Sequence, residues 1–209
     1  MHVSQNRFMT TSDQDLAARQ ITVAAEQHGW PLIADPHLRF VTPQLKTVLA
    51  VWQEQRRSRT MPARSDLTLP DLKVALPNLA FLDIQREDDR TRYKVRLIGG
   101  ALDHFLGSPA TGRFVDEAVP QPFAEKWSAL WQASVDFRAP MRTVVRVEFP
   151  NRRYYMCEAL NAPLAEDGEN PNILMIASYF HGREDGAARA NIATQLMNEL
   201  GEQAMPALT

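Results

Sequence analysis

Three aspartates, Asp66, Asp83 and Asp103, are the side chains in this sequence whose type would suit acid or base chemistry. A carboxylate does such work only beside groups that tune its pKa and bring it to the proton it moves. No nucleophile elbow, H-E-x-x-H pair, Walker loop or dinucleotide-binding glycine pattern accompanies them. We interpret Asp66 as a carboxylate that fixes the turn at 61–66, with Arg64 as its partner. The sequence therefore predicts no catalytic residue, and a protein that is not an enzyme.

A single cysteine, Cys157, limits the redox and metal chemistry that the chain can support. One thiol forms no intramolecular disulfide and no cysteine-rich zinc site, so we predict no metal and a reducing compartment. The formal net charge of −2 argues against a general affinity for nucleic acid, which needs a basic surface. The sequence shows no signal peptide and no apolar run near the roughly 18 residues that cross a bilayer. We expect a cytoplasmic protein without a membrane partner.

Helices frame the two ends of the sequence, and strands dominate its middle. A capping-box pattern predicts a helix over 12–27, Thr42 and Pro43 begin a second helix, and another capping box predicts a short helix at 69–75. Residues 35–40 are interpreted as a connector. Alternating apolar residues predict strands, and helical periodicity predicts further helices. The strands are expected at 79–84, 92–98, 141–149, 152–160 and 173–180, and the helices at 101–106, 121–137 and 187–201.

The order of two strands, helices and three strands resembles the topology of PAS domains, and several motifs sharpen the resemblance to one bacterial PAS family. These motifs are Trp52 with the arginines that follow it, the P-x-R-x-D element that contains Arg64 and Asp66, the strand segments 76–83 and 93–99, and the loop at 107–113. They occur in the order of that family between residues 43 and 182.

The resemblance implies an α+β fold, with a PAS-like five-stranded antiparallel sheet, helices across one face, and a small cavity between them. It divides the chain into an N-terminal helical extension at 1–41, a PAS-like domain at 42–182, and a C-terminal helix and tail at 183–209. Members of the family are mostly standalone modules, and PAS domains sense ligands, redox state or light, or mediate protein contacts. The fold alone does not choose among these roles.

The implied cavity is the candidate ligand site, because apolar walls with a few polar tips are typical of small-molecule sites. The alternative is a filled core, since protein interiors are close-packed. An error of one residue in strand register would exchange the two faces of the sheet and every residue assigned to them. The residues predicted to line the cavity are Tyr93, Val95, Phe105, Trp127, Trp131, Val145, Val147, Tyr155, Cys157 and Met175.

The identity of a cofactor stays open, although two familiar ones are disfavoured. Flavin photochemistry in PAS domains needs a reactive cysteine on the helical side, and the corresponding segment, 107–113, contains none. Haem-binding PAS domains usually carry an axial histidine on the long helix, and residues 121–137 contain none. We interpret His104 as a surface residue. We therefore expect neither covalent flavin photochemistry nor haem.

The leading hypothesis is a sensory or regulatory module that binds a small ligand in this cavity and signals through a partner protein. Two alternatives stay open, a protein-interaction adaptor with a filled core and no ligand and, ranked last, a small enzyme that uses the cupped sheet. Narrow apolar stripes on the terminal helices suggest a homodimer through these helices, or packing on their own sheet. Arg96, Arg142 and Arg146 could hold an anion together, and we interpret them instead as a solvated face of the sheet.

Overall fold

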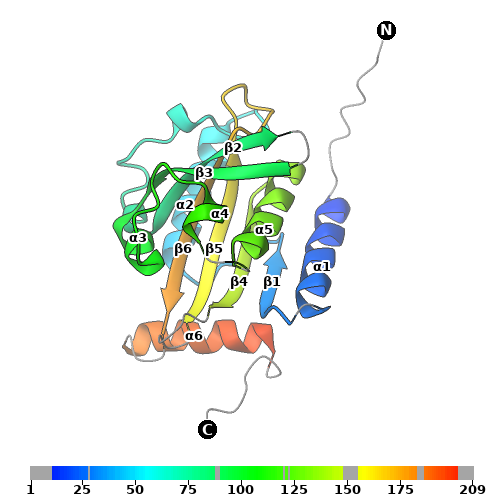
Figure 1. Ribbon diagram of the computed structural model, residues 1–209, viewed down its shortest axis with the longest axis vertical. Helices are drawn as coiled ribbons and strands as arrows, with labels where there is room; N and C mark the ends of the chain where they lie inside the picture. Colours follow the sequence, from blue (N-terminus) through cyan, green and yellow to red (C-terminus); the bar gives the residue numbers. More distant parts are fainter. Residues whose placement is uncertain are drawn as a thin grey trace.

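The structure is a computed structural model, and it describes residues 11–27, 29–87, 90–119, 121, 123–147, 155–182 and 186–201. At its centre, these residues form one antiparallel sheet in the order β1-β4-β5-β6-β2-β3 (Figure 1). The strands are β1 (Leu32–Asp35), β2 (Leu79–Glu87), β3 (Arg90–Ile98), β4 (Met141–Val147), β5 (Tyr155–Leu164) and β6 (Ile173–His181). The helices are α1 (Thr11–Gln27), α2 (Pro43–Arg56), α3 (Gly100–Leu106), α4 (Val115–Ala118), α5 (Phe123–Phe137) and α6 (Ala187–Leu200). The predicted α+β class is confirmed.

The sheet contains one strand, β1, that the sequence pattern did not reveal. It pairs with the edge of β4, where Leu32 lies opposite Val145 and Asp35 opposite Arg142. It is only four residues long and is flanked by Pro31 and a turn, so it offers too few alternating positions to predict a strand. The five predicted strands correspond to β2–β6, and the predicted strand ends at 148–149 and 152–154 lie outside the described residues.

The predicted short helix at 69–75 is wrong, because this segment forms hydrogen-bonded turns that lead into a 3-10 turn, η2 (Leu76–Asn78). The predicted capping contacts do form, since the Thr68 backbone N–H donates to the Asp71 carboxylate at 3.3 Å and the Asp71 backbone N–H donates to the Thr68 hydroxyl at 3.4 Å. A segment this short gains few helical hydrogen bonds after the cost of nucleation. Pro77 also disfavours a helical conformation at the residue before it.

Helices cover both faces of the sheet, and each face has its own core (Figure 1). We call the side under α3, α4 and α5 the front face, and the side under α2 and α6 the back face. Successive strand residues point to opposite faces. Front-face strand residues include Ala80, Leu82, Val95 and Ile176, and back-face strand residues include Leu79, Phe81, Leu160 and Met175.

The back face carries a buried group of ion pairs that connects α6 and the edge strand β1 to β4 and β5. Arg142 Nε donates to Glu158 at 2.5 Å, and its terminal nitrogens donate to Asp35 at 3.3 Å and Glu199 at 2.9 Å. Glu158 also accepts hydrogen bonds from two backbone N–H groups just before α2. Arg142 is 1% exposed and Glu158 0%, so Arg142 does not belong to the solvated sheet face that the sequence predicted. A buried guanidinium needs such partners, because an unpaired buried charge is strongly destabilising.

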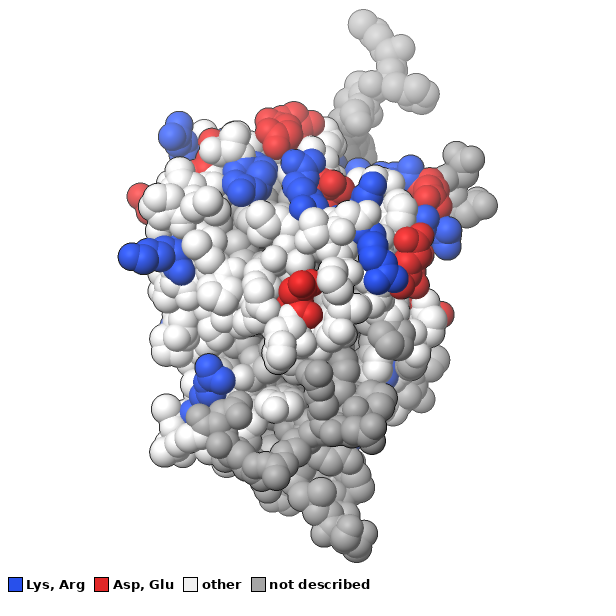
Figure 2. Space-filling model, turned by 60° about the vertical axis from the view of Figure 1, so that its left-hand side comes forward, with Lys and Arg blue, Asp and Glu red and all other residues white. Residues whose placement is uncertain are grey.

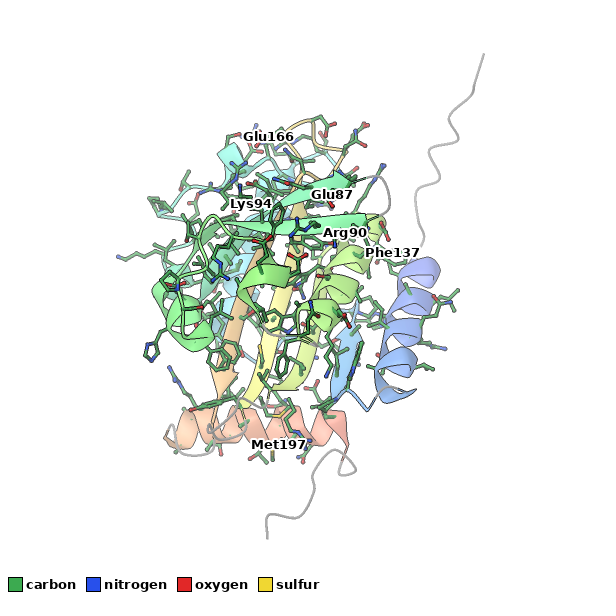
Figure 3. The ribbon with its side chains drawn as sticks, in the orientation of Figure 1. Glu87, Arg90, Lys94, Phe137, Glu166 and Met197 are labelled. Carbon is green, nitrogen blue, oxygen red and sulfur yellow. The ribbon has the colours of Figure 1, made fainter. Side chains whose placement is uncertain are left out.

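Helix α6 packs its apolar side against its own sheet. Leu196 and Ala193 contact a cluster that includes Val144 of β4 and Met156 of β5, and Met197 lies at the edge of this cluster (Figure 3). Helix α1 packs beside β1 through Ala18 and leaves Leu16 exposed. A homodimer through these terminal helices stays a prediction.

Candidate functional site

A cavity of about 100 Å³ lies between the front face of the sheet and the helices α3, α4 and α5. Its floor is formed by strand residues from β2 to β6, and its lid by the helices and the loops that join them. The floor residues are Ala80, Leu82, Val95, Ile98, Thr143, Val145, Val147, Cys157, Ala159, Asn161, Ile176, Ser178 and Phe180. The lid residues are Leu102, Phe105, Leu106, Ala110, Val115, Ala118, Val119, Trp127, Leu130 and Trp131.

Short side chains explain why the core is hollow at this point. On the floor, Thr143 lies opposite Ala159, and Ala159 lies opposite Ser178 on the next strand, so the three form one row across the sheet. Ala110 and Ala118 face the same space from the lid. Cores are normally close-packed, and short side chains on both sides therefore leave room that larger residues would fill.

Aromatic side chains form much of the wall. Phe105 of α3 stacks on Phe180 of β6 with ring centroids 3.6 Å apart, and Trp127 and Trp131 of α5 lie 6.0 Å apart. Tyr93 packs edge-on against Trp131 at 5.2 Å. Such rings give a large apolar contact area with few torsional degrees of freedom, so they suit a wall that holds a small apolar group.

The polar groups of the cavity lie on its floor. The Asn161 side-chain amide donates to the Thr143 hydroxyl at 3.2 Å and to the Met141 carbonyl at 3.3 Å. Thr143 is 3% exposed and Asn161 2%. The two residues come from neighbouring strands, β4 and β5, and their side chains meet diagonally across the pair. A hydroxyl and a side-chain amide are therefore held at fixed positions beneath an otherwise apolar space.

Cys157 is also part of the floor, as an un-ionised thiol. Burial, and then the negative charge of Glu158, raise the pKa of this thiol to about 12, against the smaller effect of a hydrogen bond with Ser178. The thiolate is the reactive form of cysteine, so this residue is inert near neutral pH. None of the lining residues that the structure describes is an acid, a lysine, an arginine or a histidine. The cavity is therefore neutral.

Seven of the residues predicted to line the cavity do lie on its wall, namely Val95, Phe105, Trp127, Trp131, Val145, Val147 and Cys157. Tyr93 belongs to the same front-face core but lies beside the cavity, where its hydroxyl donates to Gln132 at 3.3 Å. Tyr155 contacts Phe105 edge-on at 6.0 Å without lining the space. Met175 belongs to the back-face core. Its placement in the cavity was wrong because the alternate positions of β6, Ile176 and Ser178, face the front.

Three polar floor residues, Thr143, Asn161 and Ser178, and the small Ala159 were missed. Strand alternation gives the signal that could have found three of them, since Ala159 and Asn161 follow Cys157 at the spacing of one strand face. Thr143 precedes Val145 in the same way. A search for apolar side chains overlooks such positions because it selects against small and polar residues.

The three candidate carboxylates do not converge on the cavity. Asp66 accepts hydrogen bonds from Arg59 at 2.5 Å and from the Ala63 backbone N–H at 2.8 Å. Burial raises the pKa of Asp66, but these hydrogen bonds, first that of Arg59, bring the pKa below its usual value. Asp83 accepts from Arg96 at 2.6 Å. The Asp103 carboxylate accepts from the backbone N–H of residue 110 at 3.1 Å. Each therefore has a structural partner.

The P-x-R-x-D segment covers the back face of the sheet. The Arg64 guanidinium lies over the Phe81 ring at 4.2 Å and donates to the Leu67 carbonyl at 2.8 Å. The sequence led us to expect an ion pair between Arg64 and Asp66. This prediction is wrong, because Arg59 pairs with Asp66 instead. Trp52 of α2 donates its indole N–H to the Pro163 carbonyl at 2.9 Å. These contacts fix the polypeptide before β2 against the face opposite the cavity.

Other candidate chemistry is not gathered in the described part of the chain. His104 is exposed on α3 and does not line the cavity. The described residues contain no cluster of histidine, cysteine and acidic side chains that could hold a metal, and none of their helices is long and apolar enough to span a membrane. Figure 2 shows basic and acidic side chains interspersed on the face it presents. Arg92, for example, pairs with Asp116 at 2.8 Å and Glu117 at 2.9 Å.

The chain resembles a known protein family and several solved structures. The family profile described as PAS domain matches residues 41–177. Among solved structures, the chain is similar to a LOV protein of Rhodobacter sphaeroides, with 12% identity and a TM-score of 0.37, over 62% of this chain and 75% of that one. It is also similar to an RNA-binding light-oxygen-voltage receptor, with 11% identity and a TM-score of 0.40, over 66% of this chain and 38% of that one. No curated protein sequence matches the chain.

Proposed function

The chain belongs to the PAS domain family, and from that premise we propose that it is a sensory or regulatory module that binds a small ligand in its front-face cavity. The observation that supports this proposal is the cavity itself, about 100 Å³ of space between the sheet and the front-face helices. Unfilled space costs stability because the lining atoms lose packing partners. An apolar cavity with a few convergent polar groups is the default candidate for a binding site.

We propose a small metabolite as the ligand, in place of a flavin or haem. Pockets for drug-sized ligands usually measure roughly 300–1,000 Å³, and this cavity is about 100 Å³. Its only cysteine is the inert thiol of Cys157 on the floor, and His104 lies outside it. A large ring system would need the lid helices to move apart.

The signal leaves, in this proposal, through a partner protein that contacts a flanking helix. Neighbouring residues on β4 connect the two sides of the sheet, since Thr143 lines the cavity and Arg142 pairs with Glu199 of α6. A shift of β4 on ligand binding would therefore change the position of α6 relative to the sheet. We propose no catalysis, because the candidate acids Asp66, Asp83 and Asp103 are each held by other groups outside the cavity.

Native mass spectrometry of freshly purified protein, together with an absorption spectrum of the same sample, tests this function. We expect a discrete added mass that disappears on denaturation, without visible absorbance. A visible spectrum of flavin or haem would overturn the choice of ligand. A bare mass, together with no binding of any small molecule in a ligand screen, would overturn the sensory proposal and favour a protein-interaction adaptor.

A further inference from the structure

We infer that the cavity takes a compact neutral molecule, about the size of one aromatic ring, with a single hydroxyl group that bonds to Thr143 and Asn161 on the floor. This inference rests on the proposed function and adds the chemical class of the ligand. It draws on three independent features of the site, which are its volume, its charge and the hydrogen-bonding capacity that its floor leaves unused.

The volume sets the size of the ligand. An engineered apolar cavity of about 150 Å³ stays dry and binds benzene, and the cavity here is about 100 Å³. The flat rings of Phe105, Phe180, Trp127 and Trp131 border it. Offset and edge-on contacts with such rings favour a flat aromatic guest. The volume therefore limits the guest to a single ring with at most one small substituent.

The charge of the site excludes an ionised ligand. The described lining residues carry no charged side chain, and Cys157 is an un-ionised thiol. Arg142 and Glu158, the chain neighbours of Thr143 and Ala159, lie on the back face by strand alternation and pair with each other. A carboxylate or ammonium moved from water into this space would lose its hydration without gaining a partner. A neutral molecule avoids that cost.

The floor offers one donor and one acceptor for a hydroxyl group. Asn161 uses both N–H groups of its side chain, toward Met141 and Thr143, so its remaining capacity is the carbonyl oxygen, which accepts. The Thr143 oxygen accepts from Asn161, so its own proton is left to donate. Among the described residues neither group has a further hydrogen bond. A ligand hydroxyl can accept from Thr143 and donate to Asn161 at once.

Three probes of similar size separate these features: phenol, toluene and benzoate. We would titrate each into the full-length protein and follow binding by protein NMR. We expect phenol to bind at least as tightly as toluene, although its hydroxyl costs more to remove from water, and benzoate to bind at least tenfold more weakly than phenol. Toluene binding clearly more tightly than phenol would overturn the hydroxyl anchor. Benzoate binding as tightly as phenol would overturn the requirement for a neutral ligand.

Variants at position 143 test the anchor itself. Thr143→Val keeps the shape and removes the hydroxyl, so we expect the ratio of phenol to toluene affinity to shift about tenfold toward toluene. Thr143→Ser keeps the hydroxyl and should keep the wild-type ratio. Thr194→Val, at an exposed position of α6 that does not line the cavity, is the matched control and should also keep it. An unchanged ratio in Thr143→Val would overturn the anchor, and toluene binding reports that this variant is folded.

A cavity-filling variant separates failure of the inference from failure of the proposed function. Ala159→Leu adds an isopropyl group to the centre of the floor and should abolish binding of all probes. If the wild-type protein binds no probe but carries a natural ligand of another class, which Ala159→Leu removes, the sensory proposal stands and the inferred ligand class is overturned. If no probe binds and no natural ligand is carried, both are overturned.

Discussion

The two faces of the sheet are built from the same strands and have opposite character. The front face is hollow under α3, α4 and α5, where Ala159 and Thr143 leave space and the described lining residues carry no charge. The back face is filled, with Leu45 and Val48 of α2 fully buried against it. It also buries the Arg142–Glu158 ion pair. The front face therefore has the space that binding needs, while the back face holds the sheet and its flanking helices together.

Strand β5 shows this division within a few residues. Glu158 and Ala162 point to the back, where they meet Arg142 and the α2 core, while Ala159 and Asn161 point to the cavity. Because successive side chains point to opposite faces, a substitution at one position affects one face, and a substitution at the next position affects the other face. Matched pairs of variants can therefore test whether stability and binding capacity really belong to different faces.

The largest expected effect is the loss of the buried cation on the back face. Arg142→Met leaves Glu158 buried without its charge partner, and we expect the free energy of unfolding to fall by about 3–5 kcal/mol. Arg96→Met is the control, since Arg96 pairs with Asp83 at the surface and should cost less than about 1 kcal/mol. Urea denaturation followed by tryptophan fluorescence measures both. Equal losses would show that the buried pair does not stabilise the back face.

Two alanines on β5 give the next contrast, because substituting them should change the free energy of unfolding in opposite directions. Ala162 is fully buried in the back-face core, so Ala162→Val overpacks it and should cost about 1–3 kcal/mol of unfolding free energy. Ala159 borders the cavity, so Ala159→Val fills empty space and should raise stability by up to about 1 kcal/mol. Chemical denaturation of the two variants measures both changes in unfolding free energy. Destabilisation of equal size would mean that the front face is packed as tightly as the back.

Sequence patterns predicted the parts of this division that depend on local periodicity. The five long strands, the α2 helix and most of the aromatic wall follow from alternation and helical spacing. The strand β1 and the ion pairs did not, because both depend on partners distant in sequence. Asp35 and Arg142 are more than a hundred residues apart, and nothing near either one indicates that they meet.

The cavity itself shows the limit of such reasoning most clearly. The pattern named Val145 and Cys157 because they are apolar, yet Ala159 creates the space and Asn161 gives it a polar floor. Whether a core is filled or hollow depends on the sum of side-chain volumes across several elements. Periodicity carries no information on that sum. Met175 was assigned to the wrong face because the pattern of β6 is apolar on both sides.

A buried hydroxyl on α5 offers a smaller test on the helical side of the sheet. Ser134 is 0% exposed, and its hydroxyl has no hydrogen-bond partner among the described residues. An unsatisfied buried polar group is destabilising, so Ser134→Ala should raise the free energy of unfolding by about 1 kcal/mol. Ser128→Ala, half-buried on the same helix, corrects for the better helix propensity of alanine. If the two variants gain equally in thermal and urea denaturation, the Ser134 hydroxyl has a partner in solution.

The smallest expected effect concerns Asp66, which fixes the segment that covers the back face. Its hydrogen bonds, first that from Arg59, outweigh the effect of burial and hold the pKa of this carboxyl below 3.8. A lowered folded-state pKa adds stability that is fully present above the unfolded pKa and is lost as the pH falls through the folded value.

Asp66→Asn keeps an acceptor for the Ala63 N–H but loses the charge pair, so it should cost roughly 0.5 kcal/mol at neutral pH. The difference from wild type should shrink as the pH falls below the unfolded-state pKa, and disappear once the carboxyl is protonated in the folded state as well. Urea denaturation across this pH range, with Glu54→Gln as an exposed control for net charge, measures it. A difference that stays constant down to pH 2 would mean that shape rather than charge holds the turn.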